Sequence, residues 1–252
     1  MQNIIERRRK GGFTMTSYRE SHQGKSSNYD RDLQEGAFDA FMAAREERFL
    51  QQSIPVLFPQ GVPHYLDFAC GTGRITSVVE TFTQRSFGVD VSESMQAVAK
   101  SKCKKTTFFL HDMTVASLDI EPVQLVTAFR FFGNAENELR ISALNCIGRH
   151  MAGGGYLILN NHRNPSSVYI RLETSRGGKD PADLSPSKLD GLLKQAGFSV
   201  ETLFGLGLWF VHHRLNRKAV CQSGLISLID PISRISGFYR YCPDYIVVAR
   251  KI

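Results

Sequence analysis

The sequence predicts an α/β fold: a doubly wound, mainly parallel sheet of seven strands, with an N-terminal helix ahead of it and a helical insertion before its last strand. Three observations support this prediction. Short apolar runs rich in strand formers alternate with segments of helical periodicity. A glycine turn follows the first run, and the second run ends in an acid. Strands joined through helices pair in parallel, so we expect ligands at the carboxyl ends of the strands.

The expected elements follow one another closely. Apolar residues recur at helical spacing over residues 32–50, and a strand at 64–69 runs into Gly71-Thr72-Gly73 and a helix at 74–81. Three further helices are expected, at 94–101, 136–150 and 187–195. The other expected strands are 86–90, 106–110, 125–129, 156–160, 199–204 and 245–249. The glycines at 153–155 are expected to break the chain before the fifth strand.

The domain organisation predicted from the sequence is simple. Residues 1–28 form a flexible leader, and residues 29–252 form one domain, of which 205–243 are a cap or insertion. The 252 residues, 42% hydrophobic and 22% charged, are typical of a globular chain. No apolar run approaches the roughly 20 residues that span a bilayer. The five cysteines show no C-x-x-C pair, which favours the cytoplasm over an oxidising compartment.

The glycine turn indicates a nucleotide site. A strand that ends in Gly-x-Gly before a helix presents backbone N–H groups and admits a ligand closely. Asp90, at the end of the second strand, is placed to accept hydrogen bonds from ribose hydroxyls. The position that a dinucleotide fingerprint reserves for a third small residue holds Thr76, which disfavours NAD. The chain also has no phosphate-binding loop for ATP or GTP.

Three stretches resemble the motifs of class I S-adenosylmethionine-dependent methyltransferases. They are residues 66–74 (LDFACGTGR), 88–95 (GVDVSESM) and 109–113 (FLHDM). The resemblance covers about residues 60–206 and 245–250. It implies S-adenosylmethionine as the cofactor and an antiparallel final strand.

The resemblance also implies roles for individual residues. Asp67 would meet the methionine ammonium group, Asp90 the ribose and Asp112 the adenine amino group. Tyr29, ahead of the first helix, resembles part of an N-terminal lid over the cofactor. The remaining implied cofactor contacts are Ala69, Cys70, Gly71, Gly73, Arg74, Val91, Met95, Met113 and Phe129.

Two residues are candidates for catalysis. His162 follows the fifth strand, where a general base would reach a hydroxyl near the methyl group. Arg130 lies among aromatic residues after the fourth strand, and a role in holding an anion and a surface salt bridge both remain open. No metal is expected, because methyl transfer mainly requires orientation. Residues 129–134 contain neither the acids of metal-dependent catechol enzymes nor the N/D-P-P-Y/F element of amino methyltransferases.

Three functions remain open at this stage. The first is methyl transfer to a small molecule, on an oxygen of a sugar, glycan precursor or secondary metabolite. The second is RNA or protein methylation, which the net charge of +7 and the basic chain ends favour, and which the absence of an RNA-binding module opposes. The third is a non-catalytic regulatory protein that binds the cofactor. A monomer and a homodimer are both compatible with the sequence.

Overall fold

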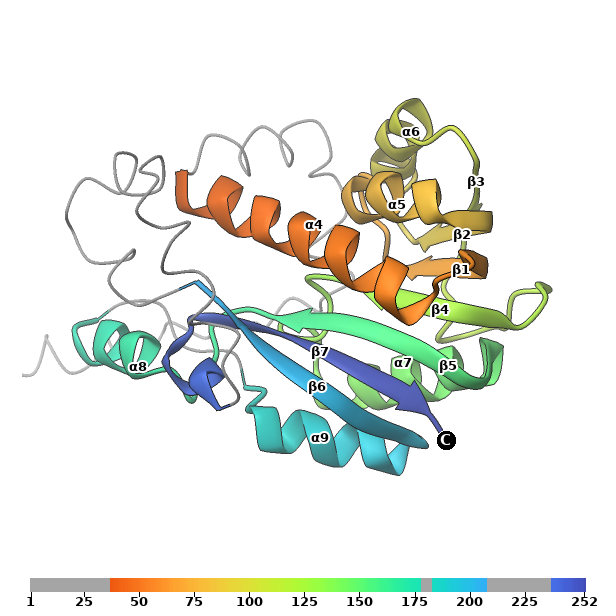
Figure 1. The fold of residues 1–252 in the computed structure, drawn as a ribbon. Helices are drawn as coiled ribbons and strands as arrows, with labels where there is room; N and C mark the ends of the chain where they lie inside the picture. Colours follow the sequence, from red (N-terminus) through yellow and green to blue (C-terminus); the bar gives the residue numbers. More distant parts are fainter. Residues whose placement is uncertain (1–36, 178–182, 208–236) are drawn as a thin grey trace, which may run out of the picture.

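The computed structural model describes residues 37–177, 183–207 and 237–252. The predicted leader, Tyr29 and most of the predicted cap lie outside these residues. The described residues form one seven-stranded sheet with the strand order β3-β2-β1-β4-β5-β7-β6 (Figure 1). The strands are β1 (Val62–Phe68), β2 (Thr83–Asp90), β3 (Thr106–Leu110), β4 (Val123–Ala128), β5 (Met151–Asn161), β6 (Phe198–Leu206) and β7 (Asp244–Lys251).

The strand directions confirm the predicted topology. Neighbouring strands from β3 through β5 pair in parallel. The last strand, β7, lies between β5 and β6 and runs antiparallel to both. The strand order reverses direction between β1 and β4, which places a crevice outside the carboxyl ends of these two strands.

Helices cover both faces of the sheet. The helices are α4 (Ala37–Leu57), α5 (Arg74–Val79), α6 (Glu93–Lys102), α7 (Asn137–His150), α8 (Val168–Ser175) and α9 (Pro186–Gln195). In Figure 1, α4, α5 and α6 lie on one side of the sheet, and α7 and α9 lie on the other. None of the helices in the described ranges is long and apolar enough to cross a membrane.

Alternation along the strands supplies both halves of the core. Successive side chains of a strand point to opposite faces, so Tyr65 packs with the α4 side and Leu66 with the α7 side. On the α4 side, Leu50 and Ile54 are fully buried, which explains why the helix continues to Leu57 rather than ending near residue 50.

The expected break at the three glycines is wrong, because β5 already begins at Met151. Against β4, Met151 pairs with Val123 whereas Tyr156 pairs with Leu125, so the glycine segment forms an irregularity within a continuing strand. The sequence also missed α8, a short helix after β5.

Candidate active site

A cavity opens where β1, β2, β3 and β4 end, on the edge of the sheet expected to bind ligands. It brings together most of the residues that the sequence singled out: Asp67, Ala69, Cys70, Gly71, Arg74, Asp90, Val91, Met95, Asp112, Met113, Phe129 and Arg130. Gly73 and His162 do not line this cavity, and Tyr29 is outside the described residues.

The cavity is also lined by residues to which the sequence assigned no individual cofactor contact: Phe68, Thr72, Ile75, Val89, His111, Thr114, Phe131 and Leu139. Four of them, Phe68, Thr72, Val89 and His111, lie inside the motif stretches, and Ile75, Thr114 and Phe131 lie close to residues that the sequence singled out. Leu139 differs, because it comes from the first turn of α7 and its apolar character predicts only a core position.

The turn after β1 is built on left-handed backbone. Ala69, Gly71 and Gly73 have φ angles of 55°, 53° and 74°. A Cβ at Gly73 would lie 2.9 Å from the Cβ of Ala99 in α6, so this glycine permits close packing of the turn against that helix. Its absence from the cavity wall is consistent with a packing role.

Asp90 holds the turn in place from the end of β2. Its Oδ2 accepts a hydrogen bond from the backbone N–H of Gly71 at 2.8 Å, and its Oδ1 accepts one from the N–H of Ser92 at 2.9 Å. A carboxylate oxygen can accept more than one hydrogen bond, so these contacts leave acceptor capacity for the hydroxyl groups of a ligand. Asp90 therefore orders the cavity edge while presenting negative charge to it.

Asp67 is a buried acid at the end of β1. Its Oδ2 accepts from the Thr76 hydroxyl at 2.6 Å, and its Oδ1 accepts from the Thr127 hydroxyl at 2.7 Å. Burial raises the pKa of Asp67 to about 6, although these hydrogen bonds and the charge of Arg74 act in the opposite direction. An ionised Asp67 would gain from a cationic ligand group in the cavity.

Asp112 and Met113 follow β3 at another corner of the cavity. The Oδ1 of Asp112 accepts from the backbone N–H of Thr114 at 2.9 Å and from its hydroxyl at 2.5 Å, which fixes the local turn. Met113 is 2% exposed and contributes to the apolar wall.

The aromatic residues after β4 divide between the cavity and the core. Phe129 and Phe131 line the cavity, whereas Phe132 is fully buried. Phe131 makes edge-to-face contacts with Phe68 and Phe132, with ring centroids 5.0 and 5.1 Å apart. The aromatic cluster is therefore partly a cavity wall and partly core packing.

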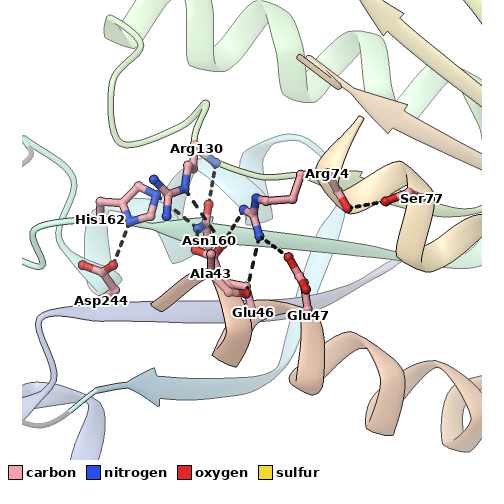
Figure 2. A network of polar contacts seen from close by, with 9 residues as sticks. All are labelled: Ala43, Glu46, Glu47, Arg74, Ser77, Arg130, Asn160, His162 and Asp244. Atoms are coloured by element: carbon pink, nitrogen blue, oxygen red, sulfur yellow. Dashed lines mark hydrogen bonds and ion pairs between the residues drawn. The ribbon is translucent and has the colours of Figure 1, made fainter. Parts of the chain in front are cut away.

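The carboxylate of Glu46, from α4, binds Arg74 of the cavity wall and lies within ion-pair distance of Arg130 (Figure 2). Glu46 is fully buried, with its Oε2 2.5 Å from Nη2 of Arg74 and 3.9 Å from Nε of Arg130. Its Oε1 accepts from Nδ2 of Asn160 at 2.6 Å. Arg130 is thus in a buried ion-pair network rather than in a surface salt bridge. The helical periodicity of α4 gave no signal for this role of Glu46.

His162 lies beyond Arg130 in the same network (Figure 2). Its Nδ1 is 2.7 Å from Oδ2 of Asp244, the first residue of β7. Among the described residues, no group of three or more histidine, cysteine or carboxylate side chains is arranged to hold a metal ion.

Comparisons with known proteins match part of the chain to methyltransferases. Residues 66–155 match the family model of the methyltransferase domain. N-demethylindolmycin N-methyltransferase of Streptomyces griseus is 29% identical over 123 residues, which are 46% of this chain and 51% of that protein. The chain therefore aligns with about half the length of this curated relative.

Solved structures show the same fold. Magnesium protoporphyrin IX methyltransferase from Synechocystis PCC 6803, with bound S-adenosylhomocysteine, has a TM-score of 0.60 at 13% identity and covers 85% of this chain and 87% of its own. An S-adenosylmethionine-dependent methyltransferase from Clostridium acetobutylicum has a TM-score of 0.61 at 14% identity, covering 89% and 98%. The chain thus has the fold of these S-adenosylmethionine-dependent methyltransferases.

The network around Glu46 generates a stability prediction with an internal control. Glu46→Gln leaves two buried or half-buried arginines facing a neutral amide, so we expect a loss of about 3 kcal/mol in the free energy of unfolding. Glu47 also contacts Arg74, but at 3.4 Å and with a side chain 35% exposed. Glu47→Gln should therefore cost less than about 1 kcal/mol. Urea denaturation of both variants measures the difference, and equal losses would contradict the role given to Glu46.

Proposed function

We propose that the chain binds S-adenosylmethionine in the cavity at the ends of β1–β4 and catalyses methyl transfer to a small molecule. The observation that carries the proposal is the arrangement of Asp67, Asp90 and Asp112 at the carboxyl ends of three adjacent strands, around one partly apolar cavity. The match of residues 66–155 to the methyltransferase domain supports it. When bound, S-adenosylmethionine supplies a methyl group on a positively charged sulfur.

The proposed binding roles follow from the chemistry of the wall. The buried carboxylate of Asp67 would attract the cofactor's ammonium group, and Asp90 would accept hydrogen bonds from its ribose. Asp112 would accept from the adenine amino group, beside the apolar surface of Val91 and Met113. Phe129 and Phe131 would exclude water from the reacting end of the cavity.

The acceptor is proposed to be a small molecule methylated on oxygen, with His162 as the base. A hydroxyl group is a weak nucleophile until its proton is removed, and His162 lies at the end of β5 next to Arg130 of the cavity wall. Nitrogen is the second candidate, because the curated relative from Streptomyces is by name an N-methyltransferase.

Cofactor binding is the first test of this function. We expect calorimetry to show that S-adenosylmethionine and S-adenosylhomocysteine bind the wild-type chain. Asp90→Ala should weaken both by about a hundredfold, because hydrogen bonds to a charged carboxylate contribute about 1.5–3 kcal/mol each. Asp190→Ala, on the exposed side of α9, is the matched control and should bind normally. The absence of binding to the wild type, or equal binding by Asp90→Ala, would reject the proposed cofactor site.

The pH dependence of binding tests Asp67 separately. A cationic ligand group favours ionised Asp67, whose pKa is about 6 in the free protein. The affinity for S-adenosylmethionine should therefore be highest and constant above this pH, and it should fall by up to about tenfold per pH unit below it. Asp67→Asn should bind more weakly and show no such fall. Calorimetry across this range measures both, and the same pH dependence in the two proteins would exclude Asp67 as the titrating group.

The acceptor class is tested by transfer of a labelled methyl group. We expect label from S-adenosylmethionine to appear in small hydroxyl compounds rather than in amines, total RNA or protein, with His162→Ala slowing the transfer about a hundredfold. Label confined to amines would establish the nitrogen alternative. Label in RNA or protein would contradict the small-molecule proposal, and cofactor binding without any transfer would favour a regulatory protein.

A further inference from the structure

Both ring nitrogens of His162 have specific partners. The Nδ1 atom lies 2.7 Å from Oδ2 of Asp244, and the Nε2 atom lies 3.3 Å from Nδ2 of Asn160. The three residues come from the end of β5 and the start of β7 and lie together in Figure 2. A neutral imidazole carries its proton on one nitrogen only, so the partners specify which nitrogen that is.

Asp244 specifies the proton at Nδ1. The Asp244 side chain is buried, which alone would raise its pKa, but His162, the backbone N–H of Arg163 and the charge of Arg130 hold the pKa below its ordinary value. The carboxylate is therefore ionised and can only accept hydrogen bonds. Nδ1 of His162 must donate to it.

Asn160 independently specifies an unprotonated Nε2. Its Oδ1 accepts from the backbone N–H of Arg130 at 2.6 Å, and its Nδ2 donates to the buried Glu46 carboxylate at 2.6 Å. These two contacts determine which end of the amide is oxygen and which is nitrogen. The group facing Nε2 is thus an N–H donor, and Nε2 must present its lone pair.

We propose that Asp244 and Asn160 are positioning residues that hold His162 in the Nδ1–H tautomer, so that Nε2 is the proton acceptor for the methyl acceptor. The inference rests on the proposed methyl transfer. The acceptor's oxygen bonds to the methyl carbon, the carbon–sulfur bond breaks with its electron pair left on sulfur, and the hydroxyl proton passes to Nε2. The resulting imidazolium is stabilised by Asp244. The contact from Asn160 is long, at 3.3 Å, so an acceptor hydroxyl can replace it.

The geometry of Asp244 makes one substitution informative. Its Oδ1 accepts from the backbone N–H of Arg163 at 3.0 Å. In Asp244→Asn the amide oxygen must occupy this position, because the backbone N–H requires an acceptor. The amide nitrogen then donates to Nδ1 of His162, which becomes an acceptor. The ring proton moves to Nε2, because the 3.3 Å contact from Asn160 is weaker than the 2.7 Å contact at Nδ1 and yields to it.

The test is ¹⁵N nuclear magnetic resonance of histidine-labelled protein at alkaline pH, where an imidazole is neutral. His162→Gln identifies the His162 signals. We expect a protonated Nδ1 and a bare Nε2 in the wild type, the reverse in Asp244→Asn, and the wild-type pattern in Asp183→Asn, an exposed control. A proton on Nε2 in the wild type would by itself overturn the inference. A tautomer in Asp244→Asn that is the same as in the wild type would overturn the role of Asp244.

Turnover separates this inference from the proposed function. With an acceptor from the labelled-methyl screen, Asp244→Asn should lower kcat about a hundredfold while KM and the Kd of S-adenosylmethionine stay unchanged. If the wild-type protein neither binds the cofactor nor transfers a methyl group, the proposed function itself is rejected. Wild-type turnover together with an equally active Asp244→Asn would reject the inference alone.

Discussion

The site depends on the contacts that the buried carboxylate of Glu46 makes with its neighbours. It joins α4 to the start of α5 through Arg74, to the turn after β4 through Arg130, and to β5 through Asn160. A buried carboxylate is costly unless each of its oxygens is paired, so the three segments must take up one arrangement together. Two of these partners, Arg74 and Arg130, also line the cavity. The helix that precedes the sheet thus sets the shape of the cavity wall.

Backbone strain gathers at the same edge of the sheet. Among the described residues, the non-glycine residues with positive φ are Ala69, Arg130 and Arg163, and each lies just after β1, β4 or β5. Such conformations cost of order 1–3 kcal/mol each and persist only where neighbouring groups hold them. The N–H of Arg130 is held by Asn160, and that of Arg163 by Asp244. The polar network therefore both supports the strained turns and orients His162.

Local patterns predicted the strands and the mainly parallel sheet, because alternation and turn chemistry act over a few residues. The antiparallel last strand and most of the cavity-lining residues were implied by the resemblance to methyltransferase motifs. Local patterns did not predict the roles of Glu46 and Asp244. In the sequence, Glu46 is one of several charged residues on the polar side of an amphipathic helix, and Asp244 is an acidic residue just before the last predicted strand. Their function arises from pairing with Asn160 and His162, more than 80 residues away in each case. The glycines at 153–155 led to a wrong prediction for a related reason. Met151 and Tyr156, on either side of them, pair with β4, so the strand continues through a segment whose composition disfavours it.

The most direct test of the account is a crystal structure of the chain with S-adenosylhomocysteine. We expect the adenosyl group in the cavity at the ends of β1–β4, with the ribose hydroxyls on Asp90, the adenine amino group near Asp112 and the ligand's amino group near Asp67. The sulfur should then point toward Phe129 and Arg130. A ligand bound elsewhere on the chain, or one in the cavity with its ribose away from Asp90, would contradict the account.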